Sequence, residues 1–308
     1  MDQREGVFRM VEGPVVEAAD PWDPESRTAE IARPRVPTGP VVDEGDPLVP
    51  PLRSGLPGWF GRWRGVLGRC LAGLPAVAAI AALPTHFFVG RVNDTVVAAP
   101  ALSDLLGGFG LLLLPVMWLA YFTVSALPLV VALAGAVAVA VTEAATGSRP
   151  APREVWRLVA YRLRPLWLWF APVGVVTQAL PLVLNAGLPS SVAPPLAIGL
   201  ALVSAAVLTF AGLLGCVVLI ERGHGPHRAL RLWSIGRPTG LLLASLAVTV
   251  LPRLADAAWG GIASTAVAVL SVLLWAIAAL VAYAQARRAE GPVSSRSLFA
   301  ELSAPELD

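Results

Sequence analysis

Charged side chains are scarce in this chain of 308 residues, and lysine is missing altogether. Only 14% of the residues are charged, and all 23 basic residues are arginine. A soluble domain carries about 25% charged residues, so this composition, with 56% hydrophobic residues, excludes an ordinary soluble protein. Arginine without lysine, alongside abundant Ala, Gly, Pro and Val, is typical of a GC-rich bacterial genome.

Cysteines are few and catalytic motifs are missing. The two cysteines, Cys70 and Cys216, lie in or beside apolar runs, which indicates packing roles rather than a disulfide framework or a metal or redox site. The sequence holds no Walker loop, CxxC, HExxH or GxSxG motif. Charged side chains are absent from residues 105–142, 166–220 and 262–286, although proton relays and carboxylate-based membrane enzymes need them there. We therefore predict a protein that is not an enzyme, without a cofactor or a bound metal.

Long apolar runs are what the sequence does contain. Between residues 66 and 286 there are several stretches of 18 or more apolar residues, and about 20 helical residues span the roughly 30 Å core of a bilayer. We predict an all-α, polytopic bundle with about six spans: 66–89, 105–145, 165–186, 194–220, 239–258 and 262–286. The second region contains Pro115 and Pro128, so it can form one kinked span or two shorter helices.

The placement of arginine predicts the orientation, because short loops rich in arginine stay on the cytoplasmic side. Arginine-rich and arginine-poor segments alternate along the chain if the second apolar region, 105–145, crosses the membrane once. The rich segments are the approach to the first span, 147–164, 221–237 and the residues after 286, and the poor ones are 91–104, 187–193 and 253–261. The pattern predicts a multi-pass protein of a bacterial plasma membrane with both termini in the cytoplasm.

Both ends of the chain lie outside the predicted membrane domain, which we place at residues 58–288. Residues 1–57 hold ten prolines and 11 acidic residues against six arginines, without apolar periodicity. Such a segment cannot bury enough apolar surface to offset the entropy of ordering, so we predict a disordered cytoplasmic tail. Residues 289–308 are predicted to form a second, short cytoplasmic tail.

The loop 147–164 is predicted to form an amphipathic helix along the inner headgroups. At 100° per residue, Arg153, Arg157 and Arg164 fall on one side, and the apolar residues from Val155 to Leu166 fall on the other. Trp156 lies at the border as an interfacial anchor. Arg162 falls near the apolar side and must extend to the surface or find a contact. We expect the helix to bend at Arg164, because a residue before proline disfavours helix.

The layout of this loop recurs along the chain. Glu143 lies four residues before Gly147, with Trp156 and the pair Arg164–Pro165 beyond. Similarly, Glu221 lies four residues before Gly225, with Trp233 and the pair Arg237–Pro238 beyond, and 55–69 is a looser copy. The repeat predicts three hairpins, each with an inner amphipathic segment, an outgoing helix and a returning helix.

At these two loops the chain resembles a group of uncharacterised actinobacterial six-span proteins, related to the membrane domain of some glycerophosphoryl diester phosphodiesterases. The residues that match the first inner-loop motif are Gly147, Arg149, Pro150, Glu154 and Trp156, and those that match the second are Glu221, Ala229, Leu230 and Arg231. The chain departs from the pattern at Gly225-Pro226, displaced by one residue, and at Leu232, where serine is usual. The resemblance covers about residues 55–290. The catalytic barrel has no counterpart in the chain, so the resemblance implies no hydrolase activity.

These observations predict a membrane scaffold, an organiser of the membrane or a partner of envelope proteins, with no nucleic-acid partner. Glu143 and Glu221 are expected to form salt bridges with loop arginines and tie hairpins together. The inner arginines either set the topology alone or also bind anionic lipid headgroups; the candidates for lipid contact are Arg153, Arg157, Arg164, Arg228 and Arg231. The alternative function is transport or lipid handling, because prolines at membrane depth build broken helices and sites. A polar cavity near the midplane would favour that alternative, and a filled apolar core would favour the scaffold.

Overall fold

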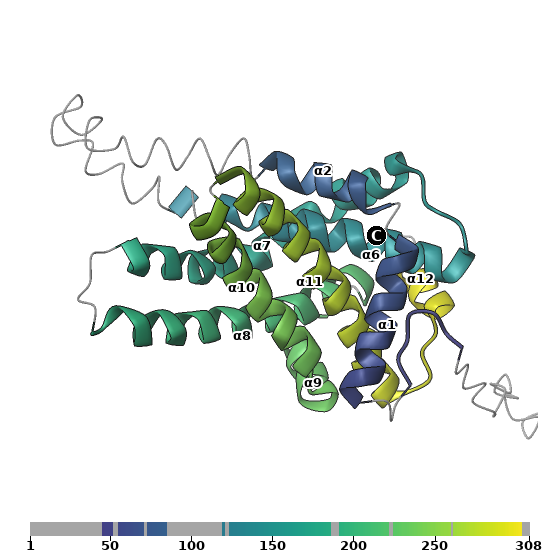
Figure 1. Cartoon of the computed structure of the whole chain (residues 1–308). Helices are drawn as coiled ribbons and strands as arrows, with labels where there is room; N and C mark the ends of the chain where they lie inside the picture. Colours follow the sequence, from purple (N-terminus) through teal and green to yellow (C-terminus); the bar gives the residue numbers. More distant parts are fainter. Residues whose placement is uncertain are drawn as a thin grey trace, which may run out of the picture. The chain divides into compact units, whose positions relative to one another are not determined.

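The part of the chain described by the computed structural model consists of helices joined by turns, without a strand (Figure 1). It comprises residues 45–51, 55–70, 73–84, 119–120, 123–185, 191–221, 224–259 and 261–303. Residues 1–44, which make up most of the predicted tail, and residues 85–118, which include the start of the second apolar region, lie outside it. The helices are α1 (Gly55–Cys70), α2 (Leu74–Pro84), α6 (Leu127–Thr146), α7 (Pro152–Asn185), α8 (Ala193–Ile220), α9 (Pro226–Gly236), α10 (Thr239–Trp259), α11 (Gly261–Glu290) and α12 (Ser295–Ser303).

Several helices are long and apolar enough to cross a membrane, which confirms the predicted polytopic helical fold. Four stretches in the described part qualify: Thr123–Thr146, Ala193–Ile220, Thr239–Trp259 and Ser264–Glu290. A fifth is present if α1 and α2, which meet at 87°, are one broken span. The predicted third span coincides with the second half of α7. The total of six spans, and whether the second region forms one helix or two before residue 119, stay predictions.

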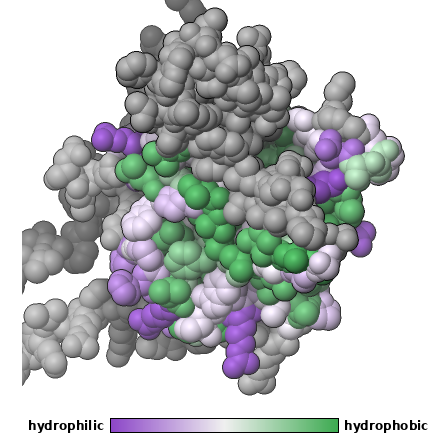
Figure 2. All heavy atoms as spheres, turned by 90° about the vertical axis from the view of Figure 1, so that its left-hand side faces the viewer, coloured by the Kyte–Doolittle hydropathy of each residue, from purple (hydrophilic) through white to green (hydrophobic). Residues whose placement is uncertain are grey.

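The surface of the helices is apolar over wide areas, as lipid-facing surfaces are. Large exposed apolar side chains occur along α7, α8 and α10, among them Leu168, Ile198, Leu202, Leu243 and Leu254. Figure 2 shows one face of the molecule, where hydrophobic side chains run across the middle and most hydrophilic ones lie toward the margins. The structure therefore describes a membrane protein.

The three returning helices pack against one another, and each outgoing helix packs between two of them. The returning helices are α6, α8 and α11. The outgoing helix α2 packs on α6 and α11, α7 packs on α6 and α8, and α10 packs on α8 and α11. The pairing repeats three times around the bundle, as expected for three hairpins of the same design. The amphipathic segments α1 and α9 precede α2 and α10, and the first half of α7 takes the corresponding place in the second hairpin.

A buried group of polar side chains joins three helices in the core. The Thr209 and Ser245 hydroxyl oxygens, on α8 and α10, lie 3.0 Å apart. The Trp275 indole N–H, on α11, donates to Ser245 Oγ at 3.2 Å. All three side chains are buried. Because Ser245 is the shared partner, it connects one outgoing helix to both of the returning helices beside it.

Replacing Ser245 by alanine is expected to lower the thermal stability of the protein. The Trp275 N–H then stays buried without its acceptor, which costs about 1 kcal/mol. For a protein of this size this corresponds to a melting temperature lower by about 2–4 °C, measured in detergent by tryptophan fluorescence. Ser234→Ala is the matched control, because the exposed Ser234 hydroxyl donates only within α9, to the Arg231 carbonyl. Equal melting temperatures for the two variants would contradict a role of this group in joining the helices.

The ends of the predicted tails are packed onto the helices, which corrects the predicted boundaries. Leu48 and Val49 are fully buried, although they lie inside the predicted tail 1–57. Asp46 accepts hydrogen bonds from the Leu48 N–H at 2.8 Å and from the Ser295 N–H, at the start of α12, at 2.7 Å. Within the predicted tail 289–308, α12 forms over Ser295–Ser303 and buries Leu298 against the helices. Composition did not reveal either segment, because only a few apolar side chains anchor each one.

The amphipathic segment α12 extends the repeat to the end of the third hairpin. Gly291 lies four residues after Arg287, as Gly147 does after Glu143, and in both pairs the glycine N–H donates to the carbonyl of the earlier residue. The sequence Gly291-Pro292 then leads into α12 as Gly225-Pro226 leads into α9. Each returning helix is therefore followed by an amphipathic segment.

The pair Arg–Pro that occurs twice in the repeat has two different structures. At Arg237–Pro238 the chain turns, since Arg237 has a left-handed φ of 42° and ends α9. At Arg164–Pro165 the chain stays helical, because α7 is one helix of 34 residues from Pro152 to Asn185. The helix therefore does not end at this pair, and the bend expected at Arg164 stays a prediction. Burial of Leu166 and Phe170 on the same face as Val159 holds the helix together across the proline.

Candidate functional site

The returning helices α6, α8 and α11 end at one end of the bundle, which we call the charged end. It comprises these three helix ends, the start of α7, and the segments α9 and α12. Six side chains form an ion-pair chain there, in the order Arg231, Glu290, Arg228, Glu221, Arg287 and Glu301. The chain connects α9, α8, α11 and α12, so it ties the second and third hairpins to the C-terminal segment.

Glu221 is the central carboxylate of this ion-pair chain. It accepts hydrogen bonds from Arg228 Nε at 2.6 Å and from the Tyr283 hydroxyl at 3.0 Å, and Arg287 Nη1 lies 3.0 Å from it. Burial raises the pKa of Glu221, but the hydrogen bonds from Arg228 and Tyr283, with the arginine charges, outweigh it, so the pKa lies below its usual range. The salt bridge that we predicted for Glu221 is confirmed.

Two of the arginines predicted to contact lipid belong to this ion-pair chain. The hydrogen bond to Glu290 raises the pKa of Arg228 above its usual range, since it and the contact with Glu221 outweigh burial. The Arg228 side chain is held by these carboxylates and is 19% exposed. Arg231 also pairs with Glu290, at 3.1 Å, but keeps 68% of its side chain exposed. Contact of either arginine with lipid stays a prediction.

Glu143 lies in the last turn of α6, three residues before the helix ends at Thr146. Its Oε2 atom is buried, and no hydrogen-bond partner for that oxygen is present in the described part of the chain. The predicted salt bridge of Glu143 is therefore not seen among the described residues. Arg149, the next arginine along the chain, is exposed in the turn after α6.

The residues of the two inner-loop motifs build helix ends. Gly147 ends α6 with a left-handed φ of 69°, which favours glycine. Glu154 reaches back to accept the Ala151 N–H at 3.2 Å and so caps the start of α7. Arg149 is exposed, and Pro150 is half-buried in the turn between the two helices. In the second motif Ala229 is buried and Leu230 is 54% exposed, so they lie on opposite sides of α9.

The first half of α7 presents its arginines away from the bundle. Val155, Val159 and Leu166 are buried, whereas Arg153, Arg157 and Arg164 are exposed. We call these three arginines the α7 arginine face. Trp156, 51% exposed, lies beside them as predicted. Arg162 is buried on the opposite side, where its guanidinium carbon lies 5.0 Å from the centre of the Tyr161 ring.

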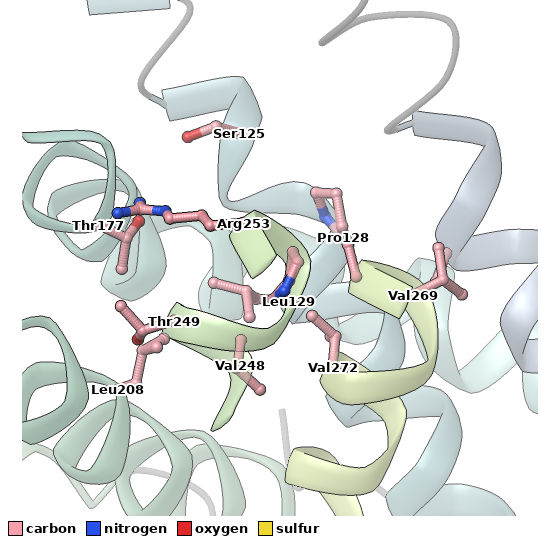
Figure 3. A pocket seen from close by; sticks show the side chains of 13 residues that line it. Ser125, Pro128, Leu129, Thr177, Leu208, Val248, Thr249, Arg253, Val269 and Val272 are labelled. Atoms are coloured by element: carbon pink, nitrogen blue, oxygen red, sulfur yellow. The ribbon is translucent and has the colours of Figure 1, made fainter. Parts of the chain in front are cut away.

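A cavity of about 220 Å³ lies away from the charged end, and side chains from α2, α6, α7, α8, α10 and α11 line it. Most of the lining is apolar, including Leu208, Val248 and Val272. The polar side chains are those of Ser125, Thr177, Thr249 and Arg253. Figure 3 shows the Arg253 and Thr177 side chains pointing toward one another, with Leu208, Val248 and Val272 on another side of the cavity.

Arg253 falls both in the predicted fifth span, 239–258, and in the segment 253–261 that we counted as an outer turn. The structure decides between the two, because Arg253 lies inside α10, which runs to Trp259. Its Nη1 atom is buried and has no hydrogen-bond partner among the described residues. A signal was present, because this arginine follows Pro252 inside an apolar run and falls in a segment expected to be poor in arginine.

The chain and its fold match no family model, no curated protein and no solved structure. The resemblance to the six-span membrane proteins therefore stays a prediction.

Proposed function

We propose that this chain is a non-enzymatic protein of a bacterial plasma membrane that organises the membrane through contacts of its cytoplasmic face with anionic lipid. The observation that carries the proposal is the α7 arginine face. Arg228 and Arg287 are paired with carboxylates of the ion-pair chain. In contrast, Arg153, Arg157 and Arg164 are exposed and point away from the bundle. An envelope protein is the second kind of partner that fits a scaffold of this type.

The chemistry of the α7 arginine face suits a headgroup layer. Each arginine near an anionic membrane surface contributes about 1 kcal/mol of attraction, so three contribute about 3 kcal/mol. Exposed Trp156 and Tyr161 flank the arginines, and such rings favour the boundary between headgroups and acyl chains. Leu168 and Trp169, one to two turns further along α7, are also exposed and suit the hydrocarbon.

The same reasoning supports the proposed orientation. Among the described residues, the charged end holds most of the arginines outside the spans, and arginine-rich segments stay in the cytoplasm. Placing the charged end inside brings α9, α12 and the start of α7 to the inner leaflet. Both termini would then be cytoplasmic.

Removing the α7 arginine face is expected to weaken the association with anionic lipid without unfolding the protein. In the variant Arg153→Gln/Arg157→Gln/Arg164→Gln, the affinity of the purified protein for phosphatidylglycerol vesicles should fall at least tenfold at low salt, because the loss of about 3 kcal/mol corresponds to roughly a hundredfold at most. Vesicles of phosphatidylcholine should bind both proteins equally. Flotation of protein reconstituted in nanodiscs with labelled vesicles measures the difference.

The matched control removes the same charge elsewhere. Arg64, Arg237 and Arg296 are exposed and lie on three different segments, so their replacement by glutamine lowers the net charge equally. If that control variant loses as much affinity as the α7 variant, the effect is one of net charge and the proposed function is wrong. Unchanged binding by the α7 variant would contradict it as well.

A further inference from the structure

Arg253 is in an unusual place for an arginine in a membrane protein. It lies six residues before Trp259, the last residue of α10, and so about 9 Å from the helix end at 1.5 Å per residue. In the orientation proposed above, it belongs to the outer half of the membrane, where arginine is disfavoured. A charged side chain inside a span is costly and is usually retained for a function.

The side chain reaches the surface only in part, because Arg253 is half-buried and one nitrogen of its guanidinium is enclosed by protein. An arginine that snorkels keeps its guanidinium in water, but Arg253 Nη1 is buried, and the side chain lines the cavity beside Thr177 (Figure 3). Among the described residues that line the cavity, none is acidic. Asp256 lies about one turn further along α10 and is exposed. It is not among the ion pairs of the described residues, so it does not neutralise Arg253.

The cavity has a cationic, hydroxyl-bearing side and an apolar side. Arg253 supplies N–H donors, which are the groups that bind a phosphate or carboxylate oxyanion. The Ser125 and Thr177 side chains line the same side, and the Thr177 hydroxyl donates to the Gly174 carbonyl at 3.1 Å. Leu208, Val248 and Val272 supply an apolar wall. A molecule that matches both sides has an anionic head and an apolar chain.

The helix that carries Arg253 is also the least buried of the four candidate spans in the described part of the chain. In its most apolar stretch, 22% of the α10 residues are buried, against 78% in α6 and in α8. Pro252 has no N–H to donate to the Val248 carbonyl, so the helix loses one backbone hydrogen bond at the wall of the cavity. The missing bond leaves the Val248 carbonyl without its partner inside α10, although the helix itself continues to Trp259.

From these observations we propose that the cavity binds an anionic amphiphile of the membrane, with Arg253 holding the oxyanion of its headgroup. A volume of about 220 Å³ is below the roughly 300–1,000 Å³ of sites that enclose a drug-sized ligand. The cavity therefore holds the headgroup and the adjoining carbons, and the rest of the apolar chain lies outside it. This site is separate from the α7 arginine face and does not depend on it.

The first test measures lipid retention by the full-length protein in detergent at 0.5 M NaCl. High salt screens exposed charges but has little effect on a buried one, so lipid on the α7 arginine face is released and lipid in the cavity stays. By native mass spectrometry, the wild-type protein should retain phosphatidylglycerol but not phosphatidylcholine. Arg253→Met should lower the retention at least tenfold, Arg253→Lys should lower it less, and Asp256→Asn should leave it unchanged.

The second test separates a ligand-binding arginine from a structural one. Without lipid, Arg253→Met should melt at a temperature equal to that of the wild type or higher by about 2–4 °C, because methionine removes an uncompensated buried charge. Added phosphatidylglycerol should then raise the melting temperature of the wild-type protein at 0.5 M NaCl but not that of Arg253→Met. A lower melting temperature for Arg253→Met without lipid would show that the guanidinium supports the fold, and it would overturn the proposal.

The remaining outcomes separate the sources of the anion. If Arg253→Met retains phosphatidylglycerol as the wild type does, or if the wild type retains phosphatidylcholine equally, the site does not bind the anionic amphiphile and the proposal fails. Inorganic phosphate serves as the competing probe. Arg253-dependent binding of phosphate without any binding of phosphatidylglycerol would overturn the amphiphile and leave a site for a free oxyanion. If the α7 variant no longer binds vesicles but still retains phosphatidylglycerol at 0.5 M NaCl, the cavity binds lipid independently of the α7 arginine face.

Discussion

Replacing Glu221 by alanine is expected to destabilise the protein by about 3 kcal/mol, because it removes the central carboxylate of the ion-pair chain. The Glu221 side chain is 7% exposed and accepts contacts from Arg228, Arg287 and Tyr283. Without it, two arginines lose a partner in a site from which water is largely excluded. For a chain of this size the melting temperature in detergent should fall by about 6–12 °C. Glu221→Gln keeps part of the hydrogen bonding and should cost less, about 2 kcal/mol.

The effect of Glu221 should depend on pH. Because the pKa of Glu221 is lower in the folded protein than in the unfolded chain, its stabilising contribution is complete above the unfolded pKa of about 4.3. The contribution is lost as the pH falls through the folded pKa. The difference in melting temperature between the wild type and Glu221→Gln should therefore be constant from pH 8 to 5 and shrink below about pH 4.3.

The matched control for this variant is Asp256→Asn, which removes an exposed carboxylate from α10. It should change the melting temperature by less than about 1–2 °C, as surface substitutions usually do. A difference between the wild type and Glu221→Gln that grows as the pH falls would contradict the sign of the pKa shift. A melting temperature for Glu221→Ala within about 2 °C of the wild type would contradict the structural role of the ion-pair chain.

A second large effect is expected from Gly215→Val, at the contact between α8 and two of its neighbours. A Cβ atom at Gly215 would lie 2.2 Å from Leu133 Cδ2 and 3.1 Å from the Phe170 ring. Leu133 and Phe170 are both fully buried, so neither has free space to move into. Overpacking of this kind costs about 3 kcal/mol, and small residues at such contacts are what let membrane helices approach closely. The fraction of monodisperse protein after heating in detergent measures the loss.

Gly199→Val on the same helix is the matched control for Gly215→Val. A Cβ atom at Gly199 meets nothing within 4 Å, so this variant changes the helix propensity of α8 without changing its packing. It should be as stable as the wild type or slightly more stable, since valine forms helix better than glycine. If both variants are destabilised equally, the cost arises within α8 and the close packing at Gly215 is not its cause.

The environments of some arginines can be predicted from the sequence, and those of others cannot. The exposure of Arg153, Arg157 and Arg164 followed from their spacing, because a helix separates residues by angle whatever it packs against. The ion pair of Arg228 could not be predicted in this way, because its partner Glu290 lies 62 residues away in the sequence. No local pattern brings two such residues together; the packing of α9 on α11 does.

The same distinction applies to the short segments at the two ends of the chain. Leu48 and Val49 stand among prolines and acidic residues, where composition predicts no structure. They are buried because Asp46 accepts the Ser295 N–H at the start of α12, a contact between residues 249 positions apart. Gly291-Pro292 did carry a signal, since it repeats the start of α9, but it lies beyond the last apolar run and was assigned to a tail.

By itself the sequence determined the helical class, the membrane-spanning character and the arginine side of α7. These depend on hydrophobicity and on the angle between successive residues, which are local properties of the chain. Only the tertiary structure decided that α7 continues through Pro165, that Glu221 gathers two arginines, and that Arg253 lines a cavity with Thr177. The physical reason is that burial and ion pairing depend on which residues are neighbours in space, and the packing of the three hairpins determines those neighbours.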